Sequence, residues 1–241
     1  MCSTSVLTLI IFADDMALTA RLKDKHSLSQ YYDFISKLTS WFDASFLKLN
    51  VQKTKELCLE GSRARDSTWL APIVIKDETV EQVETFKYLG TVLDSKLSFS
   101  KHVDFIVKKA NQRMYFIRKL NCFDVDKHIL ERVYGALVES ILVFNIVTWF
   151  GNLNVKDKLR LDRIVNNASK VVGSRRRSLS DIHKQFTRKK SNKIILDKSH
   201  PLSDCFQLLP SGRRLRVPNS RRNLYKNSFI PTAIKILNSK P

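Results

Sequence analysis

A stripe of apolar residues between positions 99 and 120 most constrains the fold of this 241-residue chain. Its members recur at steps of three and four, the spacing of one face of an α-helix. They are Phe99, Val103, Ile106, Ala110, Met114, Ile117 and Leu120. A second helix is predicted from a cap at Asp124 or Asp126 to about Phe150. A third is predicted over Val155–Val172, ended by Gly173. This part of the chain is therefore predicted to be all-helical.

The first 98 residues combine strand and helix patterns. Apolar runs at Val6–Phe12 and Met16–Ala20 predict two strands joined tightly at Ala13-Asp14-Asp15. An apolar stripe with helical spacing follows over residues 27–46. Shorter strands are predicted near 56–59, at 73–75 and at 86–93, with a hairpin turn at Lys76-Asp77-Glu78.

These patterns predict an α+β fold in three regions. Residues 1–98 form a small mixed region, residues 99–173 a helical bundle, and residues 174–241 a basic tail. The tail is expected to hold short helices separated by basic loops, the last of them over Ser228–Leu237.

The charge changes at the same boundary as the pattern. The chain has a net charge of +19, yet residues 1–98 hold 12 Lys and Arg against 13 Asp and Glu. Residues 99–241 hold 30 against 10. Such an asymmetry is typical of a region that binds a polyanion, here RNA or DNA. The densest arginines are Arg213, Arg214, Arg216, Arg221 and Arg222, with Tyr225 and Phe229 available to stack on bases.

Other classes of protein are disfavoured. The four cysteines are scattered and form no C-x-x-C pair, so neither a disulfide framework nor a zinc site is indicated. The N-terminus lacks the basic start of a signal peptide. Residues 133–150 are long enough to span a bilayer, but Glu139 and Asn145 interrupt them, which favours a core helix. An intracellular protein of the cytoplasm or nucleus is expected, with no membrane partner and no small-molecule cofactor; the sequence specifies no oligomeric state.

Several segments then resemble one known family in the expected order. "FADD", between apolar runs, resembles the Y/F-x-D-D box of reverse transcriptases. The next segment, "WFDASFLKLNVQKTKEL", is similar to the segment after that box in non-LTR retrotransposons of the LINE type. The segment "FKYLGTVLDSKLSFSKHV" resembles the family's primer-grip box, and "YGALVESILVFNIVTWFGNL" resembles its helical thumb. The segment "LLPSGRRLRVPNSRRNLYKNSFIPTAIKILN" resembles the C-terminus of LINE open reading frames.

This resemblance implies part of an RNA-directed DNA polymerase: half a palm, a thumb and a basic tail. Asp14 would be the principal Mg²⁺ ligand and Asp15 the auxiliary one, because hard Mg²⁺ prefers carboxylate oxygens. Lys53 would be a candidate general acid for the departing pyrophosphate. In the primer-grip box, the nucleic-acid-binding candidates are Lys87, Tyr88 and Gly90, the glycine allowing close approach of the backbone.

The same resemblance predicts a loss of catalysis. In this family a third carboxylate lies on a separate strand well before the Y/F-x-D-D box, and only thirteen residues precede Asp14. We therefore expect weak or absent Mg²⁺ binding and no polymerase activity from this chain alone. Nucleic-acid binding by the thumb and tail is expected to remain.

Two other hypotheses assign the chain to different classes of protein. Residues 86–123 also resemble the segment labelled AlkB homologue eight, N-terminal, which suggests a 2-oxoglutarate-dependent iron oxygenase or its methyltransferase partner. That chemistry needs two histidines and a carboxylate; His102 and Asp104 form an H-x-D pair, with His183 or His200 as the distal ligand. The predicted helical context of His102 disfavours such a site. The remaining hypothesis is a nucleic-acid-binding module without catalysis.

Overall fold

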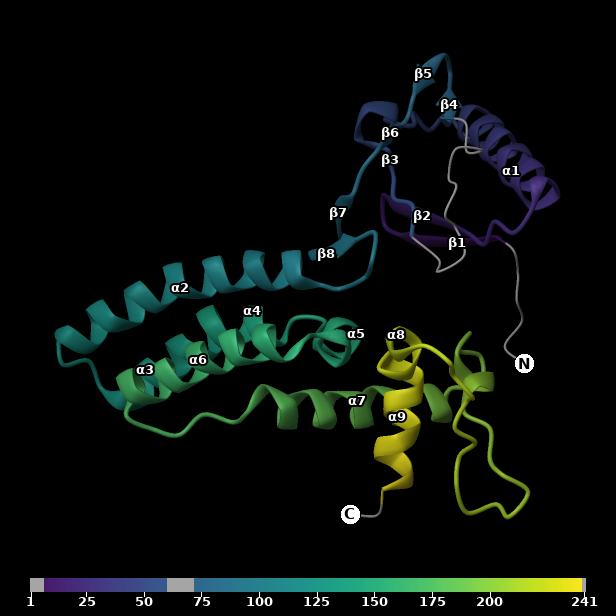
Figure 1. Ribbon diagram of the computed structural model, residues 1–241. Helices are drawn as coiled ribbons and strands as arrows, with labels where there is room; N and C mark the ends of the chain where they lie inside the picture. Colours follow the sequence, from purple (N-terminus) through teal and green to yellow (C-terminus); the bar gives the residue numbers. More distant parts are fainter. Residues whose placement is uncertain (1–6, 60–71, 240–241) are drawn as a thin grey trace. The chain divides into compact units, whose positions relative to one another are not determined.

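The structure is a computed structural model that describes residues 7–59 and 72–239 (Figure 1). It has two compact units, residues 1–84 and residues 85–241. The first unit contains short strands and one long helix, and the second is mainly helical. This distribution of elements agrees with an α+β protein.

The first unit begins with an antiparallel hairpin. Strand β1 (Leu7–Phe12) pairs with β2 (Asp15–Ala20), and Phe12 lies opposite Asp15. The two turn residues are therefore Ala13, whose φ is 53°, and Asp14. The predicted hairpin is confirmed for the described residues, and position 6 lies outside them.

Helix α1 (Lys25–Ala44) follows the hairpin, and a capping box stabilises its first turn. The Asp24 carboxylate accepts a hydrogen bond from the Ser27 amide (2.8 Å), and the Ser27 hydroxyl accepts one from the Asp24 amide (3.1 Å). This reciprocal capping box satisfies amides that have no partner within the helix. The helix packs Tyr31, Tyr32 and Ile35 against a small core. That core consists of Val51, Ile73, Ile75 and Val80.

Short elements complete the first unit. The 3₁₀ turn η1 (Val51–Lys53) leads into β3 (Lys55–Glu56), which pairs in parallel with β6 (Glu81–Gln82). Strand β4 (Val74–Ile75) pairs antiparallel with β5 (Glu78–Thr79). Their turn has φ values of 49° at Lys76 and 64° at Asp77, as a type I′ hairpin requires. The predicted hairpin turn is confirmed.

The second unit also begins with a hairpin, in the region where strand is predicted at 86–93. Strand β7 (Thr85–Tyr88) pairs with β8 (Thr91–Asp94). The chain reverses between them because Leu89 and Gly90 have φ values of 43° and 84°. The sequence pattern grouped this hairpin with residues 1–98, whereas it belongs to the helical unit: Leu93 packs against the helical core.

Helix α2 (Ser100–Cys122) buries the apolar stripe that predicts it. After it, the Asp126 carboxylate accepts a hydrogen bond from the His128 amide (2.7 Å) and caps α3 (Lys127–Tyr134). The helix continues through a π-helical turn, η3 (Gly135–Glu139), and α4 (Ser140–Val143).

The predicted helix to Phe150 is interrupted. Phe144 is extended and Asn145 has a φ of 51°, so the chain bends before α5 (Ile146–Trp149) and the 3₁₀ turn η4 (Phe150–Asn152). By length and mean hydropathy (1.6), Lys127–Asn152 could cross a membrane. In the structure its inward face forms the core of the second unit instead. That face consists of Leu130, Tyr134, Val138, Leu142, Ile146 and Trp149.

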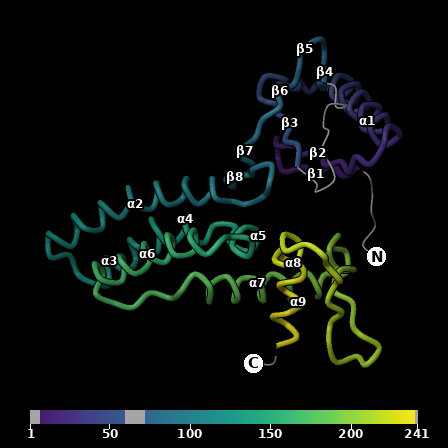
Figure 2. Tube along the Cα trace, in the orientation of Figure 1, coloured from purple at the N-terminus to yellow at the C-terminus, as the bar shows by residue number. Residues whose placement is uncertain are grey.

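Helix α6 (Val155–Val172) ends at Gly173, whose φ is 73°, as predicted. It packs along α2 (Figures 1 and 2). The expectation of only short helices after residue 174 is wrong, because α7 (Leu179–Leu196) has 18 residues. Its inward residues include Leu179, Ile182 and Ile194. The basic run at its centre hides this apolar spacing in the sequence.

The end of the chain is packed onto the helical body. After the 3₁₀ turn η5 (Ser203–Cys205) and the short helix α8 (Asn223–Lys226), α9 (Phe229–Asn238) lies across α7 (Figure 2). A separate small core joins them: Ile194, Phe206, Ala233 and Ile234. Gly151 allows this docking, since a Cβ atom there would overlap the Asn227 carbonyl oxygen.

Candidate functional site

The aspartates of the FADD sequence lie at the tip of the β1–β2 hairpin. Asp14 is the second turn residue and Asp15 is the first residue of β2, and both are exposed. A tight hairpin thus projects two adjacent carboxylates toward solvent. Within the described ranges, residues 7–59 and 72–239, no group of three or more His, Cys, Asp or Glu side chains is placed to hold a metal ion.

Mg²⁺ usually takes six oxygen ligands and keeps several waters. Asp14 and Asp15 are suitable in kind, as hard anionic oxygen donors. Two exposed carboxylates at a turn, with no third metal-binding side chain grouped with them in the described ranges, do not make a complete site. The described residues therefore do not fit a two-metal centre by themselves.

Lys53, the predicted general acid, ends the turn η1 and is exposed. The Lys53 backbone amide donates a hydrogen bond to the Asn50 side-chain oxygen (3.0 Å), and this bond fixes the backbone of the turn. The side-chain ammonium group remains in solvent. Among the described residues, no hydrogen bond or ion pair joins it to Asp14 or Asp15.

The primer-grip candidates lie on the β7–β8 hairpin. Gly90 occupies a left-handed turn position, and a Cβ atom there would lie 2.9 Å from the Phe144 ring. A glycine is thus required at position 90, both by the left-handed turn and by the contact with Phe144. The Tyr88 hydroxyl is buried and has no hydrogen-bond partner within residues 7–59 and 72–239. Lys87 is exposed, and its Nζ lies 5.0 Å from the centre of the Phe105 ring on α2.

The tail arginines divide between a loop and the start of α8. The loop is closed by a bridge between Leu208 and Leu215, and by a hydrogen bond from the Leu209 amide to the Arg214 carbonyl (2.7 Å). The Asn238 side chain of α9 pairs with both backbone groups of Leu215 (2.8 and 2.9 Å). All five predicted residues are exposed: Arg213, Arg214, Arg216, Arg221 and Arg222. Of the two predicted stacking rings, Tyr225 is exposed, whereas Phe229 packs against the α7–α9 core.

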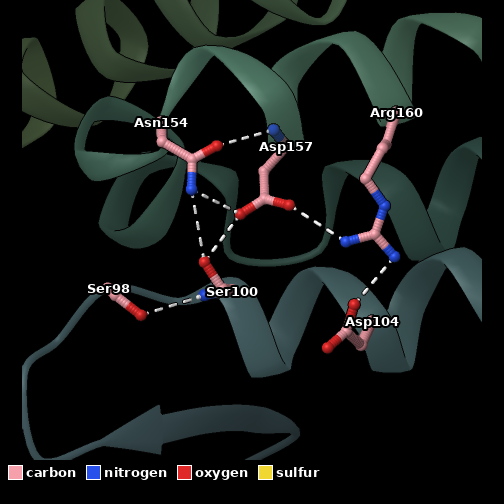
Figure 3. Close-up of polar contacts among 6 residues, drawn as sticks. All are labelled: Ser98, Ser100, Asp104, Asn154, Asp157 and Arg160. Carbon is pink, nitrogen blue, oxygen red and sulfur yellow. Dashed lines mark hydrogen bonds and ion pairs between the residues drawn. The ribbon is translucent and has the colours of Figure 1, made fainter.

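A buried carboxylate, which the sequence reasoning missed, fixes α2 against α6 (Figure 3). Asp157 accepts hydrogen bonds from the Ser100 hydroxyl (2.7 Å), the Asn154 amide group (2.9 Å) and the Arg160 guanidinium (3.0 Å). Burial alone would raise the pKa of Asp157, but these hydrogen bonds and the Arg160 charge lower it overall. Arg160 also pairs with Asp104 (2.7 Å), so one guanidinium connects both helices.

The histidines do not assemble an oxygenase triad. His102 is 1% exposed, and its Nδ1 accepts a hydrogen bond from the Val92 amide (3.3 Å). Asp104 lies two residues on along α2, on the other side of the helix, paired with Arg160. The rings of Trp149 and Phe150, which meet edge to face, lie between His183 and His102: Trp149 contacts His102 and Phe150 contacts His183. Burial lowers the pKa of both histidines to about 4, as is usual for imidazoles inside a core.

Comparison with known proteins gives two curated relatives from Drosophila melanogaster. The chain is 30% identical to the probable RNA-directed DNA polymerase from transposon BS over 167 residues, which cover 68% of this chain and 18% of the relative. It is 32% identical to the corresponding protein of transposon X-element over 96 residues, which cover 39% of this chain and 10% of the relative. The chain therefore spans less than a fifth of the length of these relatives.

Residues 100–140, which form α2, α3 and η3, match the family described as alkylated DNA repair protein alkB homolog 8, N-terminal. No solved structure matches the chain. The transposon relatives cover more of the chain than this family match does. Both parts of the resemblance are thus confirmed: the chain is similar in sequence to transposon RNA-directed DNA polymerases of the LINE type and, over one short segment, to the alkB homolog 8 N-terminal family.

Proposed function

We propose that this chain is a fragment of a LINE-type RNA-directed DNA polymerase that binds nucleic acid but does not synthesise DNA by itself. The charge of the second unit carries the binding part of the proposal. Residues 85–241 hold 32 Lys and Arg against 11 Asp and Glu. An excess of this size favours binding to a polyanion, and the names of the relatives favour RNA or DNA.

The tail arginines are the proposed main contacts. The loop that carries Arg213 and Arg214 is closed by backbone hydrogen bonds and anchored by Asn238, so less backbone entropy is lost when it binds. Arginine donates to phosphate through two parallel N–H groups and keeps its charge at all physiological pH values. Contacts of this kind bind the backbone and do not read the base sequence.

The geometry of the FADD hairpin supports the absence of polymerase activity. Phosphoryl transfer with two metals needs carboxylates that hold both ions beside the reacting oxygens. The described residues provide Asp14 and Asp15 at an exposed turn, without the third ligand and without Lys53 hydrogen-bonded to them. Incomplete coordination supports, at most, weak Mg²⁺ binding and no catalysis by this chain alone.

A titration of the full chain tests the binding. Labelled RNA and DNA of mixed sequence are titrated by fluorescence anisotropy at about 50 and 200 mM salt. Affinity should fall steeply with salt, by roughly 0.7 to 0.9 log units per log unit of salt for each phosphate contacted. Replacing the five tail arginines with glutamine should weaken binding to every sequence alike and flatten the salt dependence.

A charge-matched variant is the control for this titration. It carries glutamine at five exposed lysines of the second unit outside the tail loop: Lys156, Lys184, Lys189, Lys190 and Lys193. Equal losses in both variants would mean that net charge alone, and not the tail arginines, holds the nucleic acid. No binding by the unmodified chain would refute the proposed function.

Polymerase activity is tested with a primed RNA or DNA template, deoxynucleotides and Mg²⁺ or Mn²⁺. No incorporation is expected. Incorporation that disappears in Asp14→Ala would show that the chain is an active polymerase.

A further inference from the structure

Helix α2 has a second regular face, opposite the one buried in the core. Residues three or four apart lie on the same side of an α-helix. On the side of α2 away from the core, lysines and aromatic residues with this spacing form two groups, at 105–109 and at 115–119. We call it the α2 outer face and define it by six residues: Phe105, Lys108, Lys109, Tyr115, Phe116 and Lys119.

The aromatic residues of this face are unusually open to solvent. Tyr115 is 54% exposed and Phe116 is 58% exposed. Phe105 is partly buried at its base, where it packs against the helical core. Single exposed rings are common, but here Tyr115 and Phe116 lie together, with ring centres 5.8 Å apart in an edge-to-face arrangement, and a contiguous exposed apolar patch is typical of a binding surface.

The charge on this face is uncompensated. All three lysines are exposed, and no ion pair involves them among the described residues. The single acidic residue of α2, Asp104, is paired with Arg160 at 2.7 Å. An anion that approaches the α2 outer face therefore meets ammonium groups and no free carboxylate of the same helix.

Three ammonium groups lie over rings of this face or next to it in the fold. The Nζ atom of Lys109 is 4.6 Å from the centre of the Phe105 ring, and that of Lys87, on β7, is 5.0 Å from the same ring. Lys119 is 5.8 Å from the Tyr115 ring. These contacts place ammonium groups that can bind phosphates within 5.8 Å of the ring centres, and the open rings Tyr115 and Phe116 supply the surfaces for stacking on bases.

We propose that the α2 outer face binds single-stranded nucleic acid, with its rings stacked on unpaired bases and its lysines on the phosphates. This rests on the proposed function and adds a second surface, distinct from the tail arginines. The face from Phe105 to Lys119 is roughly 21 Å long at ~1.5 Å per residue.

An unpaired strand fits the face better than a duplex does. In a duplex the bases are stacked on one another, and their flat surfaces are unavailable to protein rings. The lysines alone would serve either form, whereas the exposed rings offer an advantage only when bases are unpaired. The preference for single strands is therefore the property that distinguishes this surface from general electrostatic binding.

The test compares two kinds of variant of the full chain. Tyr115→Ala with Phe116→Ala removes the two open rings and leaves the charge unchanged. It should weaken binding of a single-stranded oligonucleotide by about fivefold to a hundredfold, without changing the salt dependence. Replacing Lys108, Lys109 and Lys119 with glutamine should instead reduce the salt slope by roughly 2, because three phosphate contacts are lost.

Matched controls come from α7. Phe186→Ala removes a ring that is 36% exposed, and glutamine at Lys189, Lys190 and Lys193 removes three exposed charges. Neither control should alter the preference for single strands over a duplex of the same sequence. Circular dichroism melting of every variant checks that the fold is intact.

The outcomes separate the two proposals. If the tail-arginine variant is weakened and the α2 variants bind like the unmodified chain, the α2 proposal alone is overturned. Equal affinity for single strands and duplex, with no effect of the ring variant, also overturns it. If the unmodified chain binds no nucleic acid at either salt concentration, both proposals fail.

Discussion

Lowering the pH from 7 to 5 should destabilise the second unit, because two imidazoles are buried there in the neutral form. His102 is 1% exposed and His183 is 7% exposed. Burial lowers the pKa of each from 6.5 to about 4, and the charges of Lys158 and Lys184 add to the effect at His183. In the unfolded chain both rings regain the ordinary value. The unfolded state therefore binds more protons between pH 6.5 and 4, and stability falls as the pH falls through this window.

The magnitude follows from the two pKa values. At ~1.4 kcal/mol per pKa unit, the difference between 6.5 and about 4 is worth up to roughly 3 kcal/mol per ring once both states are protonated. At pH 5, where the unfolded rings are protonated and the folded ones mostly are not, the loss is about 2 kcal/mol per ring. Two rings then lose about 4 kcal/mol, a large share of the ~5–15 kcal/mol typical of a folded domain.

Urea unfolding at pH 7, 6 and 5 measures this loss. The full chain carries Trp41→Phe and Trp69→Phe, the latter outside the described residues, so that Trp149 is the remaining reporter. Trp149 is fully buried, and its ring centre lies 5.2 Å from that of His102. His183→Phe keeps a ring beside Phe150 but cannot take up a proton, so about half of the pH dependence should disappear. Equal stability at pH 7 and 5, or the full dependence in His183→Phe, would refute the reasoning.

Two further substitutions test local features of the second unit by urea unfolding. Gly90→Ala should destabilise it by about 1–2 kcal/mol or more, because φ is 84° and the new Cβ meets the Phe144 ring; Gly135→Ala, with open space around its Cβ, should be neutral or stabilising by up to ~1 kcal/mol. Similar effects at both glycines would contradict this account. Asp157→Asn should cost roughly 1–3 kcal/mol, because it weakens the acceptor shared by α2 and α6. Asp162→Asn, on the same helix and outside that network, is its control, and an equal cost would argue against a special role for Asp157.

Signals that act within a few residues were readable from the sequence. The stripe of α2, the Asp126 cap, the Gly173 stop and the Lys76-Asp77 turn were all predicted, because each depends on local spacing or on one residue's backbone preference. The FADD hairpin was also predicted, since two apolar runs flank a short polar turn. The resemblance to transposon polymerases rested on the order of such short segments, and the relatives confirm it.

Longer-range pairing decided the rest. Phe144 and Asn145 break the predicted helix, and Asn145 donates to the Thr91 hydroxyl (3.1 Å) from more than fifty positions away. The apolar face of α7 is hidden in a basic run and is recognised only where α9 covers it. Likewise, Lys87 comes to lie beside Phe105 only through the fold of the second unit.

The sequence by itself determined where helices and turns form, which part of the chain is basic, and which family it resembles. The tertiary structure alone decided which polar groups are buried, which rings stay open and which candidate residues meet. The physical reason is one of range. Helical spacing, caps and turns follow from local backbone geometry, whereas burial and pKa depend on contacts with neighbours distant in the chain, such as Asp157 with Ser100 or His102 with Trp149.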